Sequence, residues 1–300
     1  METFFSFLEK RVDDCSSLLC IGLDPHVSDL STSSRQRLPE PTAASALDFC
    51  LRLVKATAPY AAAFKPNAAF FEVFGADGWT ALKQVIEAID AESRRLGSLI
   101  PVILDAKRGD IASTAEAYAK SAFEHLGAHA ITLNPYLGFD SIQPFLGYQE
   151  KGVFLLCKTS NPGSSDLQDV LVLDDEERGK TKEGNLFPLS SFMPLHIKVA
   201  RLAQAWNTRN NIGLVVGATQ PKALTRVRAA APDLWFLAPG VGAQGGDLAQ
   251  ALGAGLRPDG RGMLVNVSRS VARTENPALA AAELRDQILE IREQFRRQGG

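Results

Sequence analysis

The sequence contains few of the residues that mark disulfide-rich, metal-binding or membrane proteins. Its 4 cysteines and 4 histidines show neither the CxxC nor the HExxH spacing of zinc sites, so we expect no bound metal. No apolar run approaches the roughly 18 residues needed to cross a bilayer. The first 15 residues lack a basic region before an apolar run, which predicts a cytoplasmic protein without a secretory signal.

An excess of charge of one sign is also missing. The chain has 32 Lys and Arg against 34 Asp and Glu, a net charge of −2, and no long run of either sign. A basic surface is what binds nucleic acid or anionic membranes, so we expect neither partner. The 45% of hydrophobic and 22% of charged residues are instead typical of a globular protein with a large core.

Short apolar or β-branched runs alternate with segments of helical periodicity along the chain. Strands are expected at 18–24, 61–67, 99–107, 130–136, 152–160, 212–219, 235–242 and 263–269. Helices are expected at 43–56, 79–95, 113–125, 194–206, 221–230 and 277–297. Alternation of this kind predicts a parallel sheet covered by helices. Eight units close most economically as an α/β fold of the (β/α)8 TIM-barrel type, whereas open doubly wound sheets more often have five to seven strands. We expect one domain over 1–300.

Two segments depart from the alternation. An N-terminal helix at about 2–15 carries Phe4, Phe5, Leu8 and Val12 at helical spacing, so it is expected to plug the closed end of the barrel. The charged segment at about 164–192, after strand five, is interpreted as a long loop. A solvated connection and an active-site lid are both consistent with it.

The run Asp105-Ala-Lys107-Arg-Gly-Asp110 is the most informative feature. Residues 105 and 107 are two apart on a strand, so both side chains are expected on one face, inside the barrel mouth. Lys65, ending the second strand, would add a cation beside them, giving an array of alternating charges. A self-satisfied ion network is the alternative for the array, and a helix cap is the alternative for Asp110. Because desolvating several charges is costly, the array favours a catalytic use.

The segment from Pro239 to Gly246 contains GxGxxG, but a dinucleotide site is disfavoured because the motif follows the seventh strand rather than the first. In barrels, the loops after strands seven and eight commonly bind phosphate. Gln244 could add a donor, and Ser268 and Arg269 follow strand eight, where a guanidinium can grip phosphate oxygens. A glycine-rich turn with a surface arginine is the alternative.

Two further strand ends carry weaker signals. Ser160, in Thr-Ser-Asn-Pro-Gly-Ser after strand five, could read the edge of a polar heterocycle, although an ordinary turn has the same composition. Asp24, ending strand one, could accept a hydrogen bond from a sugar hydroxyl or simply cap a turn.

The motifs described above follow one another along the chain in the order Asp24, Lys65, Asp105-x-Lys107-x-x-Asp110, Ser160 and the 239–246 loop. In this order the sequence resembles the orotidine 5'-phosphate decarboxylase family, in its longer bacterial type. The resemblance spans 21–269. It implies conversion of orotidine 5'-monophosphate to uridine 5'-monophosphate and CO2 in pyrimidine biosynthesis, with no cofactor or metal.

The resemblance also implies roles for the site residues. Lys107 would protonate C6 of the pyrimidine, Asp105 would face the departing carboxylate, and Lys65 and Asp24 would hold the ribose. Ser160 would read the base, while Pro239, Gln244, Ser268 and Arg269 would line the base and phosphate side. Asp110, Ile111 and Thr114 would come from the other subunit of a homodimer.

Two other functions remain open at this point. Metal-dependent sugar-phosphate decarboxylases and aldol-type synthases share DxKxxD, but the Ser160 loop and Gln244 disfavour them. A non-catalytic nucleotide-binding barrel is the second alternative.

Overall fold

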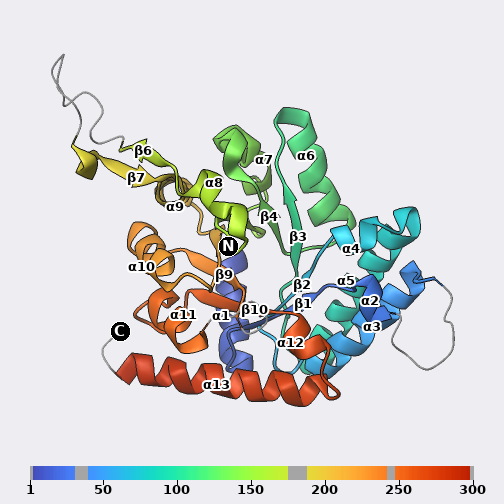
Figure 1. The fold of residues 1–300 in the computed structure, drawn as a ribbon. Helices are drawn as coiled ribbons and strands as arrows, with labels where there is room; N and C mark the ends of the chain where they lie inside the picture. Colours follow the sequence, from blue (N-terminus) through green and yellow to red (C-terminus); the bar gives the residue numbers. More distant parts are fainter. Residues whose placement is uncertain (1–2, 31–39, 175–187, 242–246, 298–300) are drawn as a thin grey trace.

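The computed structural model describes residues 3–30, 40–174, 188–241 and 247–297. Eight parallel strands form its central sheet, in the order β2-β1-β10-β9-β8-β5-β4-β3 (Figure 1). The strands are β1 (Leu19–Leu23), β2 (Ala63–Pro66), β3 (Ile103–Arg108), β4 (Ala130–Leu133), β5 (Gly152–Lys158), β8 (Ile212–Val216), β9 (Trp235–Pro239) and β10 (Met263–Val267). Each predicted strand overlaps one of them, and only β3 extends beyond its predicted range, by one residue, so the predicted succession of eight strands is confirmed.

The sheet closes on itself between its two end strands, β2 and β3. Parallel bridges join Phe64 to Val102 and Asn67 to Asp105. The Phe64 amide donates to the Pro101 carbonyl at 2.9 Å, and the Ala68 amide donates to the Asp105 carbonyl at 3.1 Å. The predicted (β/α)8 barrel is therefore confirmed, and the carboxyl ends of all eight strands face one mouth.

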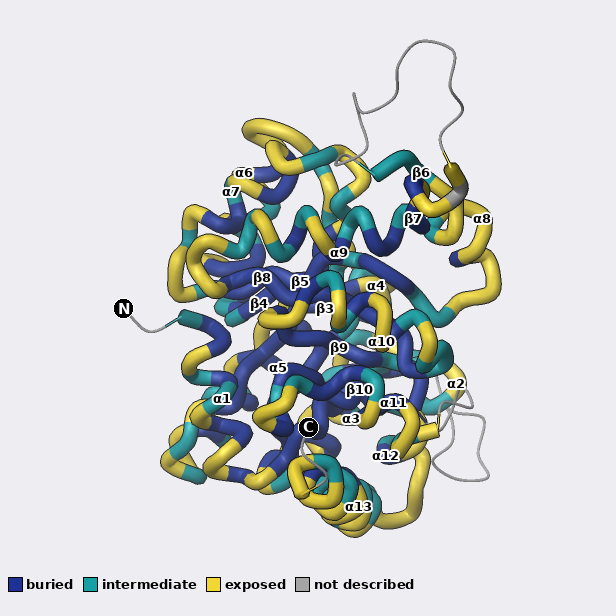
Figure 2. Tube along the Cα trace, turned by 90° about the vertical axis from the view of Figure 1, so that its left-hand side faces the viewer, coloured by how far each residue is buried: buried dark blue, intermediate teal, exposed yellow. Residues whose placement is uncertain are grey.

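Helices surround the barrel, with buried residues on the side toward the strands and exposed residues on the outer side (Figure 2). The longer helices are α1 (Phe4–Cys15), α3 (Ala43–Thr57), α5 (Gly75–Leu96), α6 (Ala112–Lys120), α9 (Leu195–Trp206), α10 (Pro221–Ala230), α11 (Leu248–Gly255) and α13 (Pro277–Arg297). Short turns of helix connect them: α2 (Val27–Leu30), α4 (Ala69–Glu72), η1 (Ser121–His125), η2 (Pro135–Leu137), η3 (Phe139–Ser141), α7 (Gln143–Leu146), η4 (Pro162–Ser164), α8 (Ser165–Gln168), η6 (Leu189–Ser191) and α12 (Arg269–Ala272). No helix in the described part of the chain is long and apolar enough to span a membrane.

Local sequence explains where several helices begin and end. A capping box formed by Thr42 and Ser45 starts α3, and proline at the first turn starts α10. Helix α5 ends where Gly97 adopts the left-handed conformation. The six predicted helices coincide with helices of the structure, whereas α11 and the short turns were not predicted.

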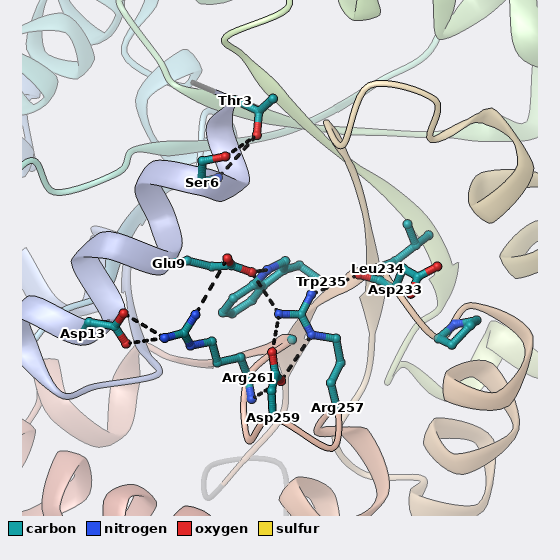
Figure 3. Close-up of polar contacts among 12 residues, drawn as sticks. Thr3, Ser6, Glu9, Asp13, Asp233, Leu234, Trp235, Arg257, Asp259 and Arg261 are labelled. Carbon is teal, nitrogen blue, oxygen red and sulfur yellow. Dashed lines mark hydrogen bonds and ion pairs between the residues drawn. The ribbon is translucent and has the colours of Figure 1, made fainter. Parts of the chain in front are cut away.

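Helix α1 closes the amino-terminal end of the barrel. The Phe4 and Phe5 rings meet the Phe154 ring edge-on, at 5.9 and 5.6 Å between centroids. A Cβ on Gly152 would lie 2.5 Å from the Phe4 ring, so a glycine there lets the helix approach. Ion pairs of Glu9 with Arg257, at 2.9 Å, and of Asp13 with Arg261, at 2.8 Å, tie the helix to the turn before β10 (Figure 3).

The segment 164–192, expected to be a long loop, has secondary structure at both ends. Helix α8 is followed by β6 (Leu171–Leu173), which pairs antiparallel with β7 (Phe192–Pro194). This two-stranded ribbon projects from the barrel beside α9 (Figure 1). The remainder of the segment, 175–187, lies outside the described residues. The expectation missed the ribbon because its two strands have only three residues each.

Candidate active site at the barrel mouth

A buried carboxylate lies between two lysines at the mouth. Lys65 Nζ is 2.6 Å from Asp105 Oδ2, and Lys107 Nζ is 2.5 Å from Asp105 Oδ1. The hydroxyl of Thr132, on β4, donates to the same Oδ1 at 3.0 Å. The structure thus brings together three predicted site residues from two strands. Thr132 was missed, because a single threonine within an apolar run gives no sequence signal.

The backbone of β3 is irregular where this carboxylate and Lys107 lie. The pairing of β3 with β4 shifts register between Leu104 and Arg108, and Lys107 has φ = 47°. Thr132 Oγ1 accepts hydrogen bonds from the amides of Ala106 and Lys107, at 3.1 and 2.9 Å. Side chains 105 and 107 therefore meet at a β-bulge rather than by regular strand alternation.

Burial differs sharply along this chain of ions. The side chains of Lys65 and Asp105 are 6% and 10% exposed, whereas that of Lys107 is 50% exposed. Burial opposes ionisation of Asp105, but the charges of Lys65 and Lys107 prevail and hold its pKa well below the ordinary value. Burial likewise disfavours charged Lys65, yet Asp105 and Asp24 raise the pKa of that ammonium. The carboxylate is fixed and ionised, and Lys107 is the member that can reach a ligand.

Two cavities open beside these ions and share Lys65, Asp105, Pro239 and Asn266. One has a volume of about 480 Å³ and is lined also by Lys107, Thr132, Leu156, Thr159, Ser160, Asn161, Gln168, Val215 and Leu237. The other, of about 330 Å³, is lined also by Asp24, His26, Asn67, Phe70, Val241, Val267, Ser268, Arg269 and Ser270. Ser160, the predicted base reader, thus lines one cavity, and Ser268 and Arg269 line the other, while Lys65 and Asp105 border both.

Two buried acceptors at the mouth have no hydrogen-bond partner in the described part of the chain: Oδ1 of Asp24 and Oδ1 of Asn266. Buried polar atoms are normally paired, so these two atoms favour a ligand that donates to them. Asn266 was not predicted, because it lies inside the apolar run of β10.

The structure does not bring every predicted site residue to these cavities. Asp110 accepts a hydrogen bond from the Ile111 amide at 2.8 Å, and neither residue nor Thr114 lines either cavity. Gln244 lies outside the described residues. A third cavity, of about 470 Å³ between η2 and α9, contains none of the predicted site residues.

In 3–30, 40–174, 188–241 and 247–297, no group of three or more His, Cys, Asp or Glu side chains is arranged to hold an ion.

Comparison with known proteins shows which family the chain belongs to. The family model described as orotidine 5'-phosphate decarboxylase / HUMPS matches residues 17–185 and 190–284. The chain belongs to this family. The orotidine 5'-phosphate decarboxylase of Roseiflexus castenholzii is 45% identical over 97% of this chain and 96% of its own length. That of Thermomicrobium roseum is 44% identical over 99% of both chains.

Solved structures of the family agree with the fold. Leishmania donovani OMP decarboxylase is 51% identical, with a TM-score of 0.79 over 97% of this chain and 99% of that one. Leishmania donovani UMP synthase is 52% identical, with a TM-score of 0.80, but this chain spans only 57% of its length. The likeness to the long relatives is therefore nearly complete, as the resemblance to the longer bacterial type implied.

Proposed function

We propose that the Lys65–Asp105–Lys107 ion chain performs the reaction of this orotidine 5'-phosphate decarboxylase, with Lys107 as the proton donor. The enzyme is a carboxy-lyase of pyrimidine biosynthesis that converts orotidine 5'-monophosphate to uridine 5'-monophosphate and CO2. One observation carries the assignment of roles. Asp105 is buried between two ammonium groups, and Lys107, half exposed, borders a cavity large enough for a nucleotide base.

The chemistry needs a fixed cation at this place. The bond between C6 and the carboxylate breaks, CO2 leaves, and the electron pair stays on C6. No adjacent carbonyl can delocalise that pair, so the protein must stabilise it directly. The Lys107 ammonium then transfers a proton to C6, and water restores the ammonium. At about 4 Å and an effective dielectric constant near 20, such a charge pair contributes roughly 4 kcal/mol.

Asp105 serves the reaction in two ways. It holds Lys107 Nζ at 2.5 Å, which fixes the proton donor before the substrate arrives. It would also lie against the substrate carboxylate, and the repulsion between the two disappears when CO2 departs. Stabilisation by Lys107 is the larger effect in this proposal, because it increases as charge develops on C6.

The two cavities give the substrate its orientation. Ser160 would contact the pyrimidine in the larger cavity, and Asp24 and Lys65 would hold the ribose beside the ions. Pro239, Ser268 and Arg269 would enclose the phosphate. The family resemblance implies that Gln244 contacts the phosphate as well. Binding energy from the phosphate can then help to organise the site around the base.

A homodimer would complete the site. Asp110, Ile111 and Thr114 line neither cavity of their own chain, so they are free to serve the partner's. Exposed apolar side chains occur in this segment and after β4, the strand next to β3. Ile111 is 49% exposed, and after β4 the exposed fractions are 72% for Tyr136, 50% for Leu137 and 40% for Phe139. Apolar surface grouped at one end of the barrel supports an interface there.

The test follows the ultraviolet absorbance of orotidine 5'-monophosphate with purified enzyme in EDTA. We expect turnover that Lys107→Ala abolishes, while Lys83→Ala, an exposed lysine on α5, leaves it unchanged. Wild-type turnover in Lys107→Ala would remove the proton donor from the proposal. Activity that needs added Mg²⁺ would favour the sugar-phosphate enzymes.

A further inference from the structure

Gln168, at the end of α8, holds the backbone that carries Ser160. Its Oε1 accepts a hydrogen bond from the Thr159 amide at 2.9 Å, and its Nε2 donates to Thr159 Oγ1 at 2.9 Å. Thr159 Oγ1 in turn donates to Asn161 Oδ1 at 2.6 Å. Both amide atoms of one side chain are thus used on the residue next to Ser160. We propose that Gln168 is a positioning residue that sets the place of Ser160 and thereby the recognition of the pyrimidine.

The end of α8 is itself anchored to the barrel. The Lys158 ammonium, whose side chain is 2% exposed, contacts Asp169 Oδ2 at 2.8 Å and Ser164 Oγ at 3.2 Å. The Nδ1 atom of His196, on α9, lies 2.9 Å from the Gln168 carbonyl oxygen. Strand β5 and α9 therefore fix the backbone of residues 168 and 169. Because the backbone of Gln168 is held by these contacts, its side chain can fix the position of Thr159.

The other side of Ser160 is closed by β8 and the residue that follows it. A Cβ on Gly217 would lie 2.9 Å from Ser160 Cβ and 3.0 Å from Ser160 N. The Gly217 amide also donates to the Lys158 carbonyl at 2.7 Å. Ser160 is therefore confined between Gly217 and the Gln168–Thr159 contact. A shift of either neighbour would therefore displace Ser160, which lines the larger cavity.

This inference rests on the proposed role of Ser160 and extends it. Gln168 lines the same cavity, and because each of its two amide atoms makes a hydrogen bond to Thr159, we assign its effect to the loop rather than to contact with the base. Loss of Gln168 should then weaken binding of ligands that carry a pyrimidine and spare ligands that lack one. A merely structural role would weaken both.

The experiment measures competitive inhibition by uridine 5'-monophosphate and by ribose 5-phosphate in Gln168→Ala. We expect the inhibition constant of uridine 5'-monophosphate to rise about tenfold, as for loss of one good hydrogen bond, and that of ribose 5-phosphate to stay within about twofold. The control is Gln204→Ala, since Gln204 also uses both amide atoms on one residue, Asp233, far from the mouth. Equal weakening of both inhibitors in Gln168→Ala, or no weakening, would overturn the inference.

Two more variants separate this inference from the proposed function. Gly217→Ala pushes on Ser160 from the opposite side and should give the same base-dependent loss. The double variant Ser160→Ala/Gln168→Ala is compared with Ser160→Ala. Its inhibition constant for uridine 5'-monophosphate should be no more than about twofold higher than that of Ser160→Ala, because contacts in one network do not add. Independent, multiplying losses would show that Gln168 does not act through Ser160 and would leave the role of Ser160 intact. A Ser160→Ala variant with normal inhibition constants would overturn the roles of both Ser160 and Gln168 and would leave the proposed reaction at Lys107 untouched.

Discussion

Lys65 Nζ lies 2.6 Å from Asp105 Oδ2, across the seam where β2 and β3 close the barrel. The two residues are 40 positions apart in the chain and belong to the two end strands of the sheet. The ion pair at the proposed catalytic centre is thus also a contact that holds the barrel shut. Substitutions here change stability and catalysis together, so each test needs a measure of folding beside the measure of rate.

Acid should weaken the fold through Asp105. Its pKa is lowered in the folded state, so its contribution is present above the ordinary value of about 3.9 and is lost as pH falls further. We expect Asp105→Asn to reduce the free energy of unfolding by about 3 kcal/mol at neutral pH. The difference from wild type should shrink progressively below about pH 4, because the unfolded chain then binds a proton on Asp105 that the folded protein, with its lowered pKa, does not bind.

Denaturant unfolding across pH measures this difference. The control is Asp48→Asn, whose partner Arg52 is exposed, and it should stay within about 0.5 kcal/mol of wild type at every pH. A deficit in Asp105→Asn that is the same at pH 3 and pH 7 would contradict the explanation. Lys65 gives the opposite sign, because its pKa is raised: its contribution is lost only above about pH 10.4.

Arg269→Ala should act on phosphate binding. We expect KM for orotidine 5'-monophosphate to rise about thirtyfold, since a charge-assisted contact is lost, and kcat to fall less than about threefold. Turnover of orotidine, which lacks the phosphate, should not change. Arg226→Ala, an exposed arginine on α10, is the matched control. A normal KM in Arg269→Ala would place the phosphate elsewhere.

Mixing subunits tests the shared site. Asp110→Ala and Lys107→Ala should each be inactive alone. A mixed dimer would then contain one site with both residues intact, so about a quarter of wild-type activity should return when the two variants exchange subunits freely. Exchange is followed independently with two differently tagged variants. Proven exchange without any recovery would count against a site built from two chains.

The Lys158–Asp169 pair predicts a stability effect away from the reacting atoms. Asp169→Ala leaves a buried ammonium that keeps, among the described residues, the hydrogen bond to Ser164 Oγ. We expect a loss of about 2 kcal/mol, reduced from the fully buried case because Asp169 is half exposed. Lys158→Met should cost less than Asp169→Ala, since it removes the charge itself. Thermal unfolding ranks the two, and the reverse order would show that the pair stabilises the fold beyond satisfying Lys158.

Sequence periodicity predicted the barrel because each strand is a compact apolar run ending in polar residues. It also placed Lys65, Asp105 and Lys107 together, since parallel strands bring their carboxyl ends to one mouth. It could not predict Thr132, Asn266 or Gln168, which are polar side chains made important only by their neighbours in space. The bulge at Lys107 was equally hidden, because it depends on a hydroxyl from the adjacent strand.

The position of α1 constrains the order in which this protein can fold during synthesis. The helix is synthesised before several groups that pack on it, which include Phe154, Trp235 and the turn containing Arg257 and Arg261. The rings of Phe4 and Phe5 thus lack their partners Phe154 and Trp235 until those later segments have been synthesised. During that interval the nascent chain carries an uncovered aromatic cluster, a target for a chaperone and a site of premature aggregation.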